Sequence, residues 1–233
     1  MFQVGNSSTW AWDSVNTATT GVTYLDGTSL QGNWATDRVC PTTDTASCAN
    51  TFKFIGIKTQ SGLRTFEDGI CGMWSAFSSG GFEDTLYVTS LFQAGAITEP
   101  TFSWYMTNTG GQSYIDFGTP DASIIGDGSN IHWVNGIQTS SWWANYVYSM
   151  KWGENSSSPD TVVTFTTVSG ITDTGSSCIV GPSQYVTPIY NEIIGKISVT
   201  VANAGWGHIF WCSDAVNLPK FSIDFGGYWF EIT

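Results

Sequence analysis

The sequence predicts a mainly β protein with a few short helices. Clusters of Gly, Asn, Asp and Ser recur along the chain, as in Leu25-Asp26-Gly27 and Thr109-Gly110-Gly111, and predict turns. Strand patterns are frequent, whereas helical periodicity is confined to two segments. The predicted strands alternate apolar with polar residues or concentrate β-branched and aromatic residues: 52–57, 161–168, 197–201 and 221–231.

Two segments carry the apolar spacing of an amphipathic helix. The first, residues 83–95, has Gly95 as its stop signal. The second, residues 183–195, begins at Ser183, a residue type that favours the N-cap position. Pro188 lies inside this second segment, so we expect either a kink or a separate first turn.

The composition excludes several functional classes. The chain has nineteen acidic and seven basic residues, which gives a formal net charge of −12. Charged residues make up only 11% of the 233 residues. A chain with this much negative charge repels phosphate backbones, and nucleic-acid binding is therefore excluded. No apolar run reaches the ~20 residues that a membrane-spanning helix needs. No glycine-rich phosphate loop is present, and we expect no cofactor.

The cysteines indicate an oxidising compartment. Cys40 and Cys48 bracket a short Thr-rich loop and predict a local disulfide, the alternative being two unrelated thiols. Together with the low charge content, this favours a secreted or lysosomal protein. Glycosylation sequons begin at Asn6 and Asn155 and fit that location. No signal peptide is visible in the chain as given. The five cysteines are Cys40, Cys48, Cys71, Cys178 and Cys212.

A weak internal similarity suggests two lobes. Residues 2–7 and 172–177 share the frame x-x-x-Gly-x-Ser when Gly5 is aligned with Gly175, and the two glycines lie 170 positions apart. We expect two similar lobes that each contribute one loop to a shared site. In the second loop, a glycine two positions after Asp173 leaves backbone N–H groups free to hold the carboxylate. The alternative is a simple Asp-Gly type of turn.

The second loop carries the strongest family resemblance. Asp173-Thr174-Gly175-Ser176-Ser177, followed by Gly181-Pro182-Ser183, is similar to the second catalytic motif of the pepsin-like (cathepsin D-type) aspartic proteases. Val22-Thr23-Tyr24 resembles the flap, a β-hairpin whose tyrosine closes over the substrate in that family. The resemblance runs in order over essentially the whole chain, and the Cys40–Cys48 loop looks most like ciliate members. Further matching segments are 68–73, 101–106, 114–118, Cys212, Leu218-Pro219 and 221–223.

The resemblance implies a bilobal, mainly β fold. Residues 1–106 would form the N-terminal lobe with the flap, and residues 107–233 an incomplete C-terminal lobe. Against the family pattern we expect the chain to be truncated at both ends, with the usual partner of Cys212 outside it. A second polypeptide or self-association would then complete the second lobe.

The first motif departs from the family. Phe2, Gly5, Ser7 and Trp10 fit Phe-Asp-Thr-Gly-Ser-Ser with its following Trp, but Gln3 stands where the first catalytic aspartate belongs. The resemblance implies Asp173 as the surviving catalytic carboxylate. It also implies a peptide site, with no metal or cofactor, formed by Tyr24, Trp10, Gly5, Thr174, Gly175, Ser176 and Ser177.

The family mechanism needs two carboxylates that share one proton. Gln3 is neutral and cannot exchange a proton near working pH, so we expect a catalytically dead or severely impaired homologue, a pseudoenzyme. The alternative is a non-enzymatic structural or peptide-binding protein of an extracellular assembly that reuses the fold. A carbohydrate-binding module on Trp142 and Trp143 is a weaker third hypothesis, and a zinc site on His132 and His208 has no supporting Cys-x-x-Cys.

Overall fold

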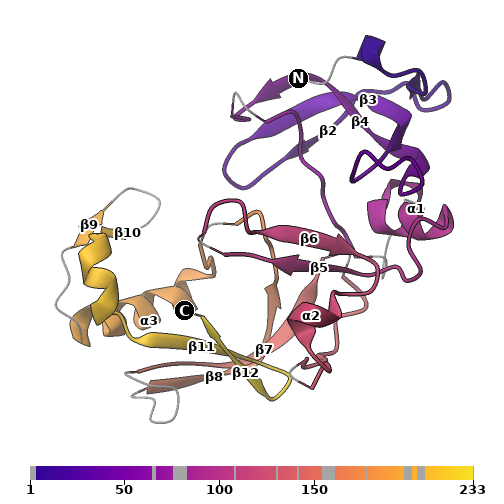
Figure 1. The fold of residues 1–233 in the computed structure, drawn as a ribbon. Coiled ribbons are helices and arrows are strands. Elements are labelled where there is room, and N and C mark those ends of the chain that lie inside the picture. The colour runs from indigo at the N-terminus through magenta and orange to yellow at the C-terminus, as the bar shows by residue number, and fades with distance from the viewer. Residues whose placement is uncertain are drawn as a thin grey trace. The chain divides into compact units, whose positions relative to one another are not determined.

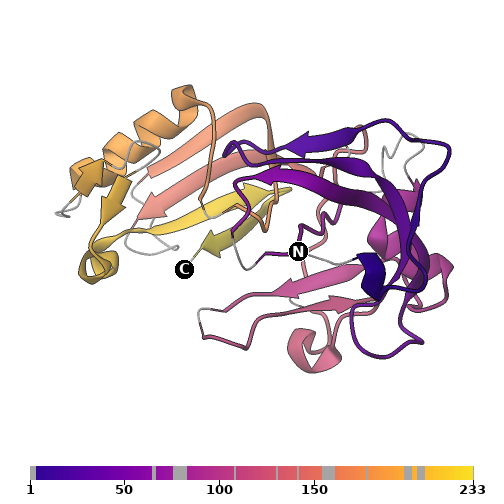
Figure 2. The same ribbon diagram turned by 90° about the horizontal axis from the view of Figure 1, so that it is seen from above.

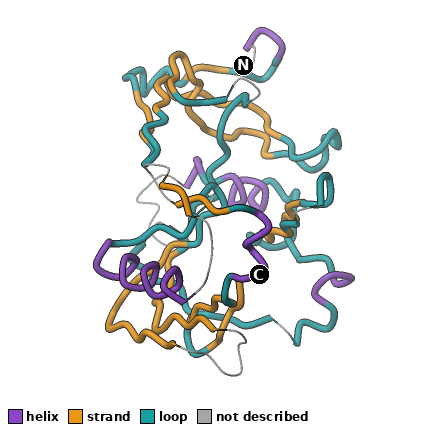
Figure 3. Tube along the Cα trace, turned by 90° about the vertical axis from the view of Figure 1, so that its left-hand side faces the viewer, coloured by secondary structure: helices purple, strands orange, loops and turns teal. Residues whose placement is uncertain are grey.

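Strands predominate throughout the computed structural model (Figure 1; Figure 3). The mainly β prediction is therefore confirmed. The chain divides into two compact units, Met1–Ile131 and His132–Thr233, while the lobes predicted from the sequence, 1–106 and 107–233, stay a prediction. The structure describes residues 4–64, 67–75, 83–107, 109–129, 131–140, 142–153, 161–176, 178–196, 201–203 and 208–232.

The sheet of the first unit is built around one long strand, β3 (Ser29–Val39). Along one edge β3 pairs with β2 (Thr20–Thr23) near its start and with β1 (Ala11–Trp12) near its end. Along the other edge it pairs with β4 (Ala49–Ser61), so the predicted strand 52–57 is confirmed and is longer than expected. All of these pairings are antiparallel. Strand β3 is therefore paired to each of the other three strands of this sheet.

A short helix, α1 (Tyr87–Gln93), packs on this sheet. Tyr87 and Leu91 form a buried cluster with Ala49, the first residue of β4. The predicted helix 83–95 is longer than the observed one because Leu86 has an extended backbone (φ −91°, ψ 104°) that separates α1 from a 3-10 turn, η3 (Glu83–Thr85).

The first unit also contains a small hairpin and one short helix. Strands β5 (Phe102–Tyr105) and β6 (Tyr114–Phe117) pair antiparallel. Helix α2 (Ala122–Ile125) follows, with Asp121 as its N-cap: the Asp121 carboxylate accepts from the Ser123 N–H at 2.7 Å. This bond helps to hold the pKa of Asp121 below its usual value.

The second unit has a four-stranded antiparallel sheet in the order β12–β11–β7–β8. Strand β8 (Thr161–Ile171) confirms the strand predicted over 161–168. The segment 221–231, expected as one strand, is a hairpin instead, because Gly226 and Gly227 adopt positive φ values (64° and 91°) and turn the chain. The other strands are β7 (Ala144–Gly153), β11 (Lys220–Phe225) and β12 (Tyr228–Ile232).

The longest helix, α3 (Ser183–Lys196), lies along this sheet (Figure 2). It confirms the helix predicted over 183–195, and it is continuous through Pro188, so the first turn is not separate. Tyr185 and Ile189 pack against a buried cluster of the sheet that includes Val147 and Phe165. The helix follows the second motif loop directly, so this packing fixes where that loop ends.

The remaining elements are short. Strands β9 (Val201–Asn203) and β10 (His208–Phe210) pair antiparallel, and a 3-10 helix, η4 (Cys212–Asn217), follows them. Most of the predicted strand 197–201 lies outside the described residues. Within the described ranges, no helix combines the length and the apolar character needed to cross a bilayer.

Candidate peptide-binding and catalytic loops

The first motif loop begins with a single 3-10 turn, η1 (Val4–Asn6). Gly5 and Asn6 are exposed, and Ser7 is half-buried. Gln3, the residue in the place of the first catalytic aspartate, lies outside the described residues. The loop then runs through Ser7 into β1, so its two ends are a helical turn and a strand paired to β3.

A buried carboxylate on β3 holds this loop. The Asp37 side chain is only 6% exposed. Its Oδ1 accepts a hydrogen bond from the Ser7 hydroxyl at 2.8 Å and another from the Thr9 hydroxyl. The Arg38 N–H donates to the same oxygen at 2.8 Å. Two loop residues that lie 30 and 28 positions earlier in the sequence are thereby fixed to one atom of the sheet.

Trp10, predicted to line the peptide site, is half-buried on an aromatic surface of the sheet. Its ring makes edge contacts with Trp12 and Phe54, with centroids 5.1 and 5.5 Å apart. Gly56 on β4 makes room for both tryptophans, because a Cβ there would lie 2.7 Å from the Trp12 ring and 2.9 Å from the Trp10 ring. The glycine in β4 is therefore part of what positions Trp10.

Tyr24 lies in the turn of the β2–β3 hairpin, the predicted flap, whose role stays a prediction. Its N–H donates to the Thr28 carbonyl at 2.8 Å. The turn is fixed by Asp26, whose carboxylate accepts from both the N–H and the hydroxyl of Thr28. These bonds lower the pKa of Asp26, whereas partial burial, together with the charge of Asp26, raises the pKa of Tyr24. Leu25 beside them is fully exposed.

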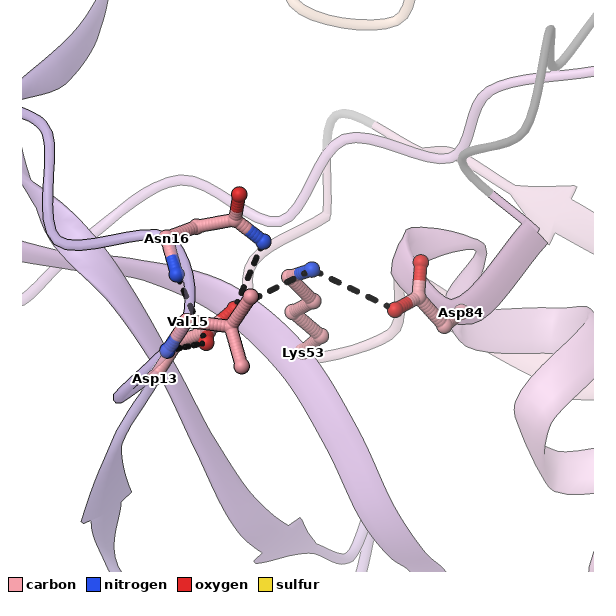
Figure 4. A network of polar contacts seen from close by, with 5 residues as sticks. All are labelled: Asp13, Val15, Asn16, Lys53 and Asp84. Carbon is pink, nitrogen blue, oxygen red and sulfur yellow. Dashed lines mark hydrogen bonds and ion pairs between the residues drawn. The ribbon is translucent and has the colours of Figure 1, made fainter.

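The loop between β1 and the flap is fixed by an ionic network (Figure 4). The Asp13 carboxylate accepts hydrogen bonds from the backbone N–H groups of Val15 and Asn16 and from the Asn16 side chain. The Lys53 ammonium on β4 lies 3.3 Å from Asp13 and 3.5 Å from Asp84. The bonds from Asn16, above all its N–H, hold the pKa of Asp13 far below its usual value. The turn at Asp13–Asn16, which precedes β2, is thus tied to β4 through Lys53.

The predicted disulfide is confirmed: Cys40 and Cys48 are bonded. They stand just after β3 and just before β4, so the bond closes the connection between these two strands. Cys71, Cys178 and Cys212 are free thiols.

Asp173 stands on the loop between β8 and α3, exposed and held by its own neighbours. Its Oδ1 accepts from the Gly175 N–H at 2.9 Å and its Oδ2 from the Ser176 hydroxyl at 2.9 Å. One residue earlier, the Thr172 N–H donates to the Trp143 carbonyl at 3.0 Å and fixes the start of the loop. Both carboxylate oxygens thus accept a hydrogen bond from a residue of the same loop.

The remaining predicted site residues stay predictions, and the structure shows where those within the described ranges lie. Thr174 and Gly175 are exposed beside Asp173, while Ser177 lies outside the described residues. Trp142 and Trp143 are about half exposed. His132 is stacked on Tyr228, at 4.3 Å between ring centroids. In the described part of the chain, no three His, Cys, Asp or Glu side chains are grouped to hold a metal.

The sequence patterns did not identify Asp37 and Asp13, the two carboxylates that hold the first motif loop and the turn after β1. Asp37 was visible as a single acidic residue in an otherwise strand-like segment, where an unpaired charge would be costly. Asp13 was visible only as the start of an Asp-x-x-Asn turn. Neither pattern identifies these partners, because the hydroxyls and the ammonium involved come from residues 28 or more positions away.

Comparison with known proteins agrees with the family resemblance of the sequence motifs. The family model described as eukaryotic aspartyl protease matches residues 1–233. The chain belongs to the eukaryotic aspartyl protease family. Penicillopepsin-1 of Penicillium janthinellum is 29% identical over 212 residues, which cover 90% of this chain and 60% of that protein. Pregnancy-associated glycoprotein 2 of Bos taurus is 33% identical over 134 residues, covering 56% of this chain and 32% of that protein.

Two further proteins extend the comparison. An aspartic protease of Phaffia rhodozyma is 25% identical over 217 residues, covering 92% of this chain and 50% of that protein. The crystal structure of an aspartic proteinase from Irpex lacteus superposes with a TM-score of 0.72 at 21% identity, over 97% of this chain and 64% of that one. This similarity confirms the pepsin-like fold. The chain spans 60% or less of the length of these three curated relatives.

Proposed function

We propose that this member of the aspartyl protease family binds extended peptides but hydrolyses them very slowly or not at all. The observation that carries the proposal is an asymmetry between the motif loops. Asp173 keeps donors on both carboxylate oxygens, from Gly175 and Ser176. The corresponding position of the first motif is occupied by Gln3.

The chemistry of the family explains why one carboxylate is insufficient. In the family mechanism, an ionised carboxylate takes a proton from the attacking water while its protonated partner donates a hydrogen bond to the scissile carbonyl. Gln3 has no exchangeable acidic proton, so Asp173 can act as a base but has no acidic partner. General acid–base assistance is worth about 10²–10⁴-fold in rate, and the proposal expects a loss of at least that size.

A non-enzymatic peptide-binding or structural role in an extracellular assembly is the second candidate. The flap supports peptide binding without catalysis, since the turn at Asp26 and Thr28 and the aromatic surface under Trp10 do not depend on Gln3. The partner would be a peptide or protein segment. The Cys40–Cys48 disulfide supports a secreted or lysosomal location.

The test uses the unmodified chain and the Asp173→Asn variant. Both are incubated with a denatured protein at pH 3–5, with and without a statin-type peptide inhibitor. We expect no inhibitor-sensitive cleavage above that of Asp173→Asn. Cleavage that the inhibitor abolishes, and that Asp173→Asn loses, would contradict the pseudoenzyme reading.

A binding titration separates a peptide-binding role from a purely structural one. Calorimetry with the statin-type peptide is carried out on the unmodified chain and on Tyr24→Ala, with Leu63→Ala, outside both motif loops and the flap, as the control. Binding that Tyr24→Ala weakens and the control preserves supports a peptide site under the flap. No binding in any of the three proteins favours a purely structural role.

A further inference from the structure

We propose that Asp37 is a positioning residue, which fixes the first motif loop (residues 4–10) to the strand that also forms the flap. The carboxylate is 6% exposed, and one of its oxygens accepts three hydrogen bonds. Two of the donors, Ser7 and Thr9, belong to the motif loop. The third, the Arg38 N–H, belongs to the strand itself.

The burial of this carboxylate needs a reason. Removing a charged group from water is unfavourable unless hydrogen bonds compensate, and an apolar residue would fill a buried strand position at less cost. The compensating hydroxyls at Asp37 come from a loop that has no strand pairing before Ala11. The acceptor oxygen of Asp37 therefore determines where the Ser7 and Thr9 hydroxyls lie.

The place of Asp37 in the sheet connects the loop to the flap. Residues 29–32 of β3 pair with β2 and form the flap hairpin, and residues 35–36 of the same strand pair with β1. Asp37 follows directly. One strand thus sets both the base of the flap and the loop in which Gly5 stands, and a shift of either is transmitted to the other through β3.

The chemistry of the contact predicts which substitutions matter. All three bonds go to Oδ1. Asn keeps an oxygen acceptor of the same shape at this position, whereas Leu keeps the volume and removes the acceptor. Asp37→Asn should therefore preserve the position of the loop that Asp37→Leu releases.

Amide hydrogen exchange, read by mass spectrometry on the full chain, tests the proposal. In Asp37→Leu, amides of residues 4–10 should exchange at least tenfold faster than in the unmodified chain, while those of 173–176 stay unchanged. Asp37→Asn should exchange like the unmodified chain. The matched control is Asp44→Asn, which makes the same change in a carboxylate whose Oδ1 accepts from the Ala46 N–H and whose Oδ2 accepts from the Ser47 hydroxyl, both in its own surface loop.

Three outcomes would overturn the positioning role. Exchange of residues 4–10 in Asp37→Leu could equal that in the Asp44→Asn control. Exchange could instead rise equally across all strands of the first unit, which is general destabilisation. Asp37→Asn could also release the loop as fully as Asp37→Leu, which would show that the acceptor oxygen is not what holds it.

The consequence for peptide binding rests on the proposed function and has a separate readout. Affinity for the statin-type peptide should fall at least tenfold in Asp37→Leu and be restored in Asp37→Asn. If the unmodified chain does not bind this peptide, the proposed function fails, while hydrogen exchange still decides whether Asp37 positions the loop. Unchanged affinity in Asp37→Leu, with the loop released, would contradict a role for the loop position in binding.

Discussion

The two motif loops are held in different ways. In the second, Asp173 accepts hydrogen bonds from Gly175 and Ser176, two and three residues further on. In the first, Ser7 and Thr9 donate to a buried carboxylate about thirty residues away, on another strand. The turn at Asp173 is therefore closed by hydrogen bonds within its own sequence, whereas the first loop needs the sheet of its unit to be assembled.

This difference bears on the proposed replacement of the first catalytic aspartate by Gln3. A loop organised around its own carboxylate has little to hold it once that carboxylate is replaced. A loop held from outside can keep its position when Gln3 takes that place, because the donors to Asp37 are Ser7 and Thr9. The first loop can thus lose its chemistry and still present a formed surface.

The largest effect is expected from a substitution that disrupts the sheet supporting the first loop. In Gly32→Ala, the added Cβ would lie 2.0 Å from the Gly56 carbonyl oxygen, so the β3–β4 pair must separate locally. We expect a loss of about 3 kcal/mol in the free energy of unfolding of the first unit, measured by urea titration. Gly69→Ala is the control, since nothing lies within 4 Å of its Cβ. Equal stability of the two variants would contradict the register of β3 and β4.

A second prediction concerns the disulfide that joins the ends of β3 and β4. Cys40→Ser with Cys48→Ser removes a bond that closes a loop with a sequence separation of 8. We expect a loss of about 2 kcal/mol, with faster hydrogen exchange at the Asp37 end of β3. Cys71→Ser, a change at a free thiol, controls for thiol loss. Exchange that changes in residues 173–176 instead would contradict the independence of the two loops.

The third prediction is a pH dependence of the stability of the first unit, through Asp13. The pKa of Asp13 is lowered in the folded chain, chiefly by the Asn16 N–H, so its contribution to stability is present above the unfolded pKa of about 4 and is lost as pH falls below it. Asp13→Asn should lower Tm at pH 7, and the difference from the unmodified chain should shrink towards pH 2. Thermal unfolding at both pH values measures it. A difference that grows towards low pH would contradict the network in Figure 4.

The smallest expected effect is in the second loop. Ser176→Ala removes an exposed hydrogen bond to Asp173, and we expect a loss of only about 0.5 kcal/mol in global stability. Hydrogen exchange should nevertheless rise in residues 173–176 and not in 4–10. A global loss as large as that of Gly32→Ala would show that the second loop also supports the fold.

The sequence predicted the parts of the site that local patterns determine. The flap turn at Tyr24, the Asp173 loop and the Cys40–Cys48 disulfide follow from turn chemistry, a short motif and cysteine spacing. The hairpin within 221–231 was missed as a hairpin, although Gly226 and Gly227 gave the signal, because alternation continues on both sides of the turn.

The rest depends on contacts between distant segments. Asp37 can bond to Ser7 and Thr9 only when β1 is paired to β3. Lys53 can contact Asp13 only when β4 is paired to β3 as well. The position of a carboxylate in the sequence does not indicate which distant hydroxyl or ammonium it will contact in the fold. The helix 83–95 was predicted too long for a related reason, since an extended Leu86 is buried in the core rather than continuing the helix.

The central claim is that the second loop keeps a carboxylate that cannot catalyse alone. The most direct measurement is the ratio of peptide-bond cleavage rates of the unmodified chain and its Asp173→Asn variant, on a denatured protein at pH 3–5. We predict a ratio near one, both rates being insensitive to a statin-type inhibitor. A ratio of a hundred or more, abolished by the inhibitor, would show that the chain hydrolyses peptides with Gln3 in place.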